Sequence, residues 1–140
     1  MNIPFTFKPD DQILATGQPG ASDFAALKNN GYSTIINLRS EGEMMGINEA
    51  RMVEENGMDY IHFPIAGATG ITVENARKLD TMIKDARAGK IVIHCASSNR
   101  VGALLALRAF HCEGKSASEA INYGRDAGLA GLIGHVQNLI

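Results

Sequence analysis

A cysteine and an arginine separated by four small or polar residues form the segment of this sequence best suited to chemistry. Cys95 begins the segment and Arg100 ends it, and the residues between them are Ala96, Ser97, Ser98 and Asn99. A guanidinium presents a planar fork that can bind two oxygens of a tetrahedral oxyanion, which a lysine cannot do bidentately. Nearby cations lower the pKa of a thiol from about 8.5 to roughly 3.5–7.5 and so favour the nucleophilic thiolate. The segment therefore predicts a nucleophile beside an oxyanion site.

The position of this segment strengthens the prediction, because it joins a predicted strand to a predicted helix. The apolar run Ile91-Val92-Ile93 precedes it, and a helical pattern starts near Val101. Ligands of open α/β sheets bind outside the carboxyl ends of the strands, and N–H groups at a helix start can converge on an anion. We therefore expect the four small residues, with Val101 and Gly102, to form an oxyanion-binding loop. Taken singly, Cys95 would be a small buried side chain and Arg100 an exposed charge.

Strand and helix patterns alternate along the rest of the chain. Short apolar or β-branched runs predict strands at residues 12–16, 33–38, 60–65 and 91–93. Helices are predicted to start near Ser22, Ile47, Thr72 and Val101 and to stop at Gly31, Gly57 and Gly89, with breaks in the last at Gly114, Gly128 and Gly134. This alternation favours an α/β fold with a mainly parallel sheet. The fully apolar 91–93 run indicates a central strand covered on both faces.

Composition and charge exclude several classes of protein. The chain has 140 residues, 45% of them hydrophobic, and a formal net charge of −2, which favours one domain over residues 1–140. A general nucleic-acid binder or a polybasic membrane anchor would need an excess or a cluster of cations. No apolar run approaches the roughly 20 residues of a membrane span, and the first residues lack the pattern of a signal peptide. Two cysteines are too few for a disulfide scaffold, so we expect a reduced, cytoplasmic chain.

The catalytic segment and several others resemble one branch of a phosphatase superfamily. His94-Cys95, the small-residue loop and Arg100 are similar to the signature of the cysteine-dependent protein phosphatases. The wider chain resembles the phosphatase-like domain of the beta-lactamase hydrolase-like family in segments 16–19, 35–39, 63–65 and 71–72. The resemblance implies a four- or five-stranded α/β fold of the dual-specificity or tyrosine phosphatase type. It also implies hydrolysis of phosphomonoesters through a cysteinyl-phosphate on Cys95, with Arg100 as the oxyanion clamp and without a metal or cofactor.

The loop differs from that of the tyrosine and dual-specificity phosphatases, which place five residues between the cysteine and the arginine. The four-residue spacing is similar to that of rhodanese-type sulfurtransferases, which carry a persulfide on the cysteine. The usual loop glycine is absent, and we expect Asn99 to adopt the left-handed conformation in its place. Val101 replaces the usual serine or threonine, so Ser97 or Ser98 would have to supply a hydroxyl to the thiolate.

A general acid for the leaving group cannot be assigned from the sequence. Relatives carry an aspartate on the loop after the third strand, but here that loop reads Ala66-Gly67-Ala68-Thr69-Gly70. Glu74 and Asp59 are the nearest acids, and Glu74 is expected in the first turn of a helix, where it interacts favourably with the helix dipole.

Two further residues are candidates for support of the site. By the resemblance, His94 orients or hydrogen-bonds groups near the thiolate. Arg39 follows a predicted strand and should lie at the same sheet edge as Cys95, where it either attracts an anionic substrate or is an ordinary exposed charge. Cys112 is expected to be a buried structural thiol beyond disulfide reach of Cys95.

Three functions remain open at this point. A phosphatase acting on a small anionic substrate or a phosphorylated protein is favoured by most of the chain. A sulfurtransferase with a persulfide on Cys95 is favoured by the loop length. A non-catalytic oxyanion-binding or redox-sensing module would use the same loop.

Overall fold

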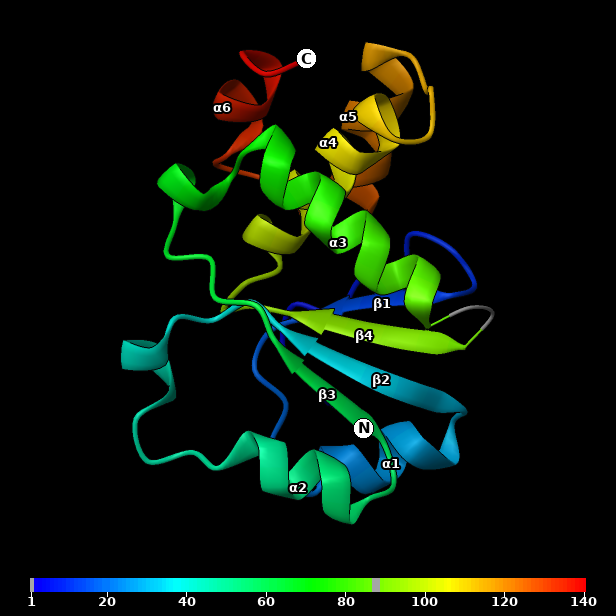
Figure 1. Cartoon of the computed structure of the whole chain (residues 1–140), viewed down its shortest axis with the longest axis vertical. Coiled ribbons are helices and arrows are strands. Elements are labelled where there is room, and N and C mark those ends of the chain that lie inside the picture. Colours follow the sequence, from blue (N-terminus) through cyan, green and yellow to red (C-terminus); the bar gives the residue numbers. More distant parts are fainter. Residues whose placement is uncertain (1, 87–88) are drawn as a thin grey trace.

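The strands of the protein form one parallel sheet, shown in Figure 1 as a computed structural model that describes residues 2–86 and 89–140. The strands are β1 (Ile13–Thr16), β2 (Tyr32–Asn37), β3 (Asp59–His62) and β4 (Lys90–His94). Their order in the sheet is β1-β4-β2-β3, and every neighbouring pair is parallel. The predicted parallel α/β architecture is therefore confirmed with four strands, and the apolar strand β4 is an internal one.

Helices cover both faces of this sheet (Figure 1). One face carries α1 (Asp23–Asn29) and α2 (Glu49–Glu55), and the other carries α3 (Val73–Asp85), α4 (Asn99–His111), α5 (Ala117–Asp126) and α6 (Ile133–Gln137). Successive strand side chains point to opposite faces, so Ile91 and Ile93 join the core under α3 and α4 while Val92 joins the core against α1 and α2. Strand β4 is thus buried on both sides. Within the described residues, no helix is long and apolar enough to cross a membrane.

The strand register brings the last residues of all four strands to one edge of the sheet. Thr16 pairs with His94, His94 pairs with Asn37, and Asn37 pairs with His62. The residues that follow these strands therefore start from the same edge. Cys95 leaves this edge from the internal strand β4, with strand ends on both sides of it.

Several predicted elements differ from the structure at their ends, and the bounds of β3 and α2 differ for identifiable reasons. Strand β3 ends at His62 rather than at Ile65, because Pro64 has no N–H for a sheet ladder, although Ile65 N–H still donates to the Leu38 carbonyl (2.8 Å). The helix expected from Ile47 starts only at Glu49, and Ile47 lies outside it and is exposed. A separate 3-10 turn, η1 (Glu41–Met44), precedes it.

The glycines of the C-terminal half act in different ways. Gly114 and Gly128 have φ values of +71° and +102°, which are unfavourable for other residues, and they separate the helices as expected. The predicted break at Gly134 is wrong, because this residue lies inside α6 without a positive φ. At Gly102 a Cβ atom would lie 2.3 Å from the Leu129 nitrogen and 2.6 Å from the Gly124 carbonyl oxygen. The absence of a side chain at Gly102 therefore lets the start of α4 approach the end of α5.

Candidate active site

Cys95 is fully buried where β4 ends and the predicted loop begins. Its N–H donates to the Thr16 carbonyl (3.2 Å), and Ser97 forms an isolated bridge with Gly17. At Gly17 a Cβ atom would lie 2.8 Å from the Ala96 carbonyl oxygen, so the loop and the segment after β1 are in close contact. The backbone around the thiol is therefore fixed from the neighbouring strand.

The left-handed residue of the loop is Ser98, so the expectation for Asn99 is wrong. Ser98 has φ 65° and is the N-cap of α4. Its hydroxyl donates to the Phe5 carbonyl (2.6 Å), which commits it to the N-terminal segment rather than to the thiol. The Asn99 side chain accepts hydrogen bonds from the N–H groups of Ala130 (2.9 Å) and Leu132 (3.3 Å), and so it holds the segment before α6.

Helix α4 begins at Asn99, shortly after Cys95 in the chain. The first hydrogen bond of the helix runs from Gly102 N–H to the Ser98 carbonyl (2.9 Å). The N–H groups of Asn99, Arg100 and Val101 precede this bond and have no acceptor four residues back within the helix. Together with the positive end of the helix dipole they favour a bound anion next to Cys95.

Arg100 is held by a carboxylate that comes from a distant segment. Its Nη1 and Nη2 groups donate to the two oxygens of Glu43 (2.9 and 2.8 Å), and Nη1 also donates to the Ile65 carbonyl (2.6 Å). The hydrogen bonds to Glu43 raise the pKa of Arg100, and the neighbouring Cys95 side chain raises it further, against the effect of burial. Arg100 thus lies beside Cys95 as a cation whose direction is fixed by Glu43 and the Ile65 carbonyl.

Glu43 lies in η1 and remains a carboxylate anion. Its pKa is lowered to about 2, first by the hydrogen bond from Arg100 and also by the N–H and hydroxyl of Ser40, which outweigh the opposite effect of burial. Those two groups donate to Glu43 Oε2 at 2.6 and 2.9 Å. Arg39 Nε lies 3.7 Å from Oε1. Two arginines therefore share one carboxylate.

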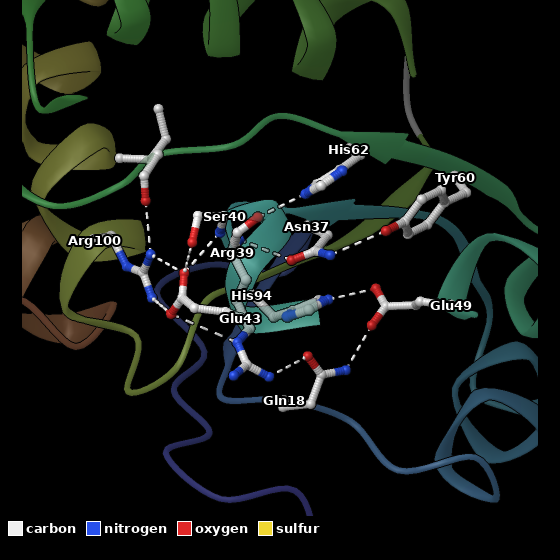
Figure 2. Close-up of polar contacts among 11 residues, drawn as sticks. Gln18, Asn37, Arg39, Ser40, Glu43, Glu49, Tyr60, His62, His94 and Arg100 are labelled. Carbon is white, nitrogen blue, oxygen red and sulfur yellow. Dashed lines mark hydrogen bonds and ion pairs between the residues drawn. The ribbon is translucent and has the colours of Figure 1, made fainter. Parts of the chain in front are cut away.

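A chain of polar contacts runs from these arginines to the histidine before Cys95 (Figure 2). Arg39 Nη1 donates to Gln18 Oε1 (2.8 Å), and Gln18 Nε2 donates to Glu49 Oε1 (2.5 Å). Glu49 Oε2 lies 2.6 Å from His94 Nε2. The Glu49 and His94 side chains are 1% and 0% exposed, and a buried carboxylate requires such donors. His94 is therefore held in place by α2.

The turn after β2 is fixed by its own contacts, and these position Arg39 at the edge. The Arg39 N–H donates to Asn37 Oδ1 (2.8 Å), and Asn37 Nδ2 donates to the Tyr60 hydroxyl (3.0 Å). His62 Nε2 lies 2.6 Å from the Arg39 carbonyl oxygen. Arg39 thus lies at the sheet edge expected for it, in contact with Gln18 and facing Glu43.

The nearest acids suggested by the sequence do not join this cluster. Asp59 begins β3 and so lies at the opposite end of that strand from His62. Glu74 lies in the first turn of α3, as expected, and is 3.4 Å from Lys78 with a side chain that is 79% exposed. The loop after β3 contains a short 3-10 turn, η2 (Ala68–Gly70), and no carboxylate.

Sequence reasoning missed Glu43 and Glu49. Ser40 and Glu43 have the Ser-x-x-Glu spacing of a capping box, which the structure contains and which could have indicated a helical turn there. Glu49 gave no such signal, because an acid in the first turn of a helix usually lies on the surface. Cys112 ends α4 and, like Cys95, is a free cysteine, but it is only partly buried.

Comparisons of sequence find relatives over most of the chain. The sequence model of one protein family, DSP-PTPase phosphatase fused to NAD+ Kinase, matches residues 6–127. A beta-lactamase hydrolase-like protein of Agrobacterium fabrum is 31% identical over 102 residues, which are 70% of this chain and 23% of that protein. The chain therefore spans less than a quarter of the length of that curated relative.

Comparisons of structure find the same fold at low sequence identity. The crystal structure of Tk-PTP in the active form has a TM-score of 0.79 and 18% identity, and the match covers 97% of this chain and 93% of that one. A variant of P. aeruginosa TpbA in complex with pTyr has a TM-score of 0.66 and 12% identity, with 96% and 81% of the chains covered. The fold is that of the cysteine-dependent phosphatases, as the resemblance implied.

Proposed function

The chain belongs to the family of DSP-PTPase phosphatases fused to NAD+ kinase, and on this premise we propose that it hydrolyses phosphomonoesters through a cysteinyl-phosphate on Cys95. The observation that carries the proposal is the position of Arg100 beside Cys95 at the N-terminus of α4. The phosphatase fold supports it. A small phosphorylated molecule or a phosphorylated protein would be the substrate.

In this mechanism the phosphoryl oxygens bind to the N–H groups at the start of α4 and to Arg100. A guanidinium has five N–H donors, and three hydrogen bonds from Arg100 go to Glu43 and Ile65, which leaves donors for a substrate. The Cys95 thiolate attacks phosphorus, the S–P bond forms and the bond to the leaving oxygen breaks. Water then attacks phosphorus, releases phosphate and restores the thiolate.

The remaining residues of the network would serve as positioning residues. Glu43 holds the end of the Arg100 guanidinium and so fixes its direction. Glu49 holds His94 directly before the nucleophile. Such fixed donors stabilise the charge of a phosphoryl transition state without reorganisation during the reaction.

The test is the release of p-nitrophenol from p-nitrophenyl phosphate between pH 5 and 8. Wild type and the Cys112→Ser control should turn over, whereas Cys95→Ser should lose turnover because it lacks the nucleophile. Acid-quenched wild type should carry a phosphoryl group on the peptide that contains Cys95. Turnover that persists in Cys95→Ser would overturn the proposal.

The four-residue spacing of the loop favours one second candidate, transfer of sulfur through a persulfide on Cys95. Formation of thiocyanate from thiosulfate and cyanide measures this activity. Sulfur transfer that depends on Cys95, together with no release of p-nitrophenol, would replace the phosphatase proposal. If neither activity appears and phosphate still binds, the site is a binding module.

A further inference from the structure

The carboxylate nearest to Arg100 is unsuited to donate a proton. Glu43 accepts hydrogen bonds from Arg100, from the Ser40 N–H and from the Ser40 hydroxyl, and it faces Arg39 at 3.7 Å. All of these partners are hydrogen-bond donors or cations, and they favour the ionised form. Its pKa of about 2 agrees with this geometry. At pH 5–8, Glu43 is an anion with no proton to give to a leaving group.

The loop after β3 also contributes no acid to the site. It supplies the Ile65 carbonyl to Arg100, and its residues 66–70 are Ala, Gly, Ala, Thr and Gly. The histidine that ends β3, His62, is bound through Nε2 to the Arg39 carbonyl. The two acids of this cluster, Glu43 and Glu49, therefore hold a cation and a histidine rather than protonate a substrate.

Arg39 is a second cation beside the carboxylate that holds Arg100. Its side chain is 18% exposed, and Nη1 is held by Gln18. Its Nε atom is buried and makes no hydrogen bond within the described residues. Glu43 lies between Arg39 and Arg100, and Gln18 separates Arg39 from the Glu49 carboxylate. Two arginine cations thus lie at this sheet edge in addition to the helix N-terminus. A fixed cation of this kind stabilises negative charge that develops during a reaction.

This arrangement has a consequence for the leaving group. In phosphoryl transfer the leaving oxygen takes the electron pair of the broken P–O bond, and without a proton donor it departs as an anion. The conjugate acid of a leaving group has a pKa of about 10 for a tyrosine-like phenol, about 6 for a phosphate and about 4 for a carboxylate. Anhydrides of phosphate or of a carboxylate therefore need no acid.

Resting on the proposed function, we propose that the substrates are phosphoanhydrides, in which the leaving group departs as an anion, and that Arg39 faces this anion in place of a general acid. The Cys95 thiolate forms the S–P bond while the P–O bond of the anhydride breaks, and the released phosphate or carboxylate keeps the electron pair. Water then cleaves the S–P bond. The water oxygen bonds to phosphorus and both of its protons stay on the product, which leaves as dihydrogen phosphate, and the thiolate returns.

The experiment measures kcat/KM for a graded series of leaving groups. The probes are substituted phenyl phosphates, glycerol 2-phosphate as an alkyl ester, and acetyl phosphate and methyl diphosphate as anhydrides. We expect kcat/KM to fall on the order of tenfold for each unit of leaving-group pKa, because no proton transfer offsets the developing charge. The alkyl ester should show no measurable turnover. A nearly flat dependence would overturn the inference.

Substitution of Arg39 tests the second half of the proposal. Arg39→Gln should lower kcat/KM on the order of a hundredfold for acetyl phosphate and methyl diphosphate. The loss should be smaller for p-nitrophenyl phosphate, whose leaving charge is spread over a ring, and Arg39→Lys should restore part of it. Arg51→Gln, which removes an exposed arginine paired with Glu55 on α2, is the control. Equal losses for all substrates would mean that Arg39 only supports the structure.

These outcomes separate the inference from the proposed function. Wild type that lacks Cys95-dependent turnover of p-nitrophenyl phosphate would overturn both. Turnover that depends on Cys95 but hardly varies with the leaving group would leave the phosphatase proposal standing and overturn the inference alone.

Discussion

At the scale of single residues, the Glu43–Arg100 pair determines how the guanidinium is presented. Arg100 donates to both carboxylate oxygens, and its side chain is only 12% exposed, against 29% for Glu43. Bidentate pairs of this kind are stronger and more directional than other surface ion pairs. The Ser40 N–H and hydroxyl also donate to Glu43. The Glu43–Arg100 pair therefore connects the segment after β2 to the start of α4.

This pair gives a prediction about pH. The pKa of Glu43 is lowered from 4.5 to about 2 in the folded state, so its stabilising effect is present above pH 4.5 and is lost as the pH falls toward 2. Glu43→Gln should reduce the free energy of unfolding by about 1–2 kcal/mol at pH 7. The difference from wild type should stay constant at pH 5–8 and shrink below about pH 4.

Urea unfolding at pH 3, 4, 5 and 7 measures this difference. The control is Glu74→Gln, which alters an exposed pair with Lys78 and should change stability by no more than about 0.5 kcal/mol. A difference between wild type and Glu43→Gln that is as large at pH 3 as at pH 7 would contradict the assignment.

The sequence proposes Cys95 and Arg100 as the reactive residues, which stays a prediction, and it does not indicate the residues that hold them in place. The prediction of Cys95 and Arg100 depended on a local spacing within one loop. Glu43 lies 57 residues from Arg100 in sequence, and Glu49 lies 45 residues from His94. Only the parallel strand order brings these residues together, and no local pattern records it. Carboxylates that hold a cationic side chain are therefore identified only in the folded chain, whereas a candidate nucleophile is indicated by its neighbours in the sequence.

At the scale of elements, the close approach of α4 and α5 positions the start of α4. Gly102 faces Gly124 and Leu129, and a Cβ atom at Gly102 would lie under 3 Å from backbone atoms of both. Backbone atoms cannot rotate away as a flexible side chain can. The contact therefore fixes the first turn of α4, which carries Arg100.

Gly102→Ala should lower the free energy of unfolding by about 3 kcal/mol, because the two helices must separate to accept the methyl group. Gly134→Ala is the matched control, since Gly134 lies within α6 and a Cβ atom there would have no neighbour within 4 Å apart from the backbone of its own helix. That change should be neutral or stabilise by about 0.5–1 kcal/mol through helix propensity. Urea unfolding compares them, and a Gly102→Ala protein as stable as wild type would show that the helices adjust freely.

The predicted elements agree with the structure where local sequence determines them and differ where tertiary contacts do. Thr72 caps α3 through its own side chain, which accepts the Asn75 N–H. By contrast, Ser22 is the N-cap residue of α1, but its side chain makes no hydrogen bond to the N–H groups at the start of that helix. Gly102 and Gly134 look alike in sequence, yet one is required by a neighbouring helix and the other is not.

At the scale of the whole molecule, the sheet joins two cores and the site lies at the edge they share. Strand β4 contributes Ile93 to the core under α3 and α4 and Val92 to the core against α1 and α2. The loop that begins at Cys95 continues this strand, and Glu43 and Glu49 approach it from the segment that leads into α2. The contacts of the site therefore form only when the helices on both faces of the sheet are in place.

An oxyanion that binds this site should accordingly stabilise the molecule as a whole. A ligand that binds only the folded state adds about 2.7 kcal/mol at a concentration of 100 times its Kd, so inorganic phosphate should raise Tm by several degrees. Cys95→Ser should keep this rise, because the donors remain, and Arg100→Lys should lose most of it with the bidentate fork. Arg77→Lys, at an exposed position on α3, should behave as wild type. Differential scanning fluorimetry over a phosphate titration measures the shifts, and an equal rise in Arg100→Lys would place the bound anion elsewhere.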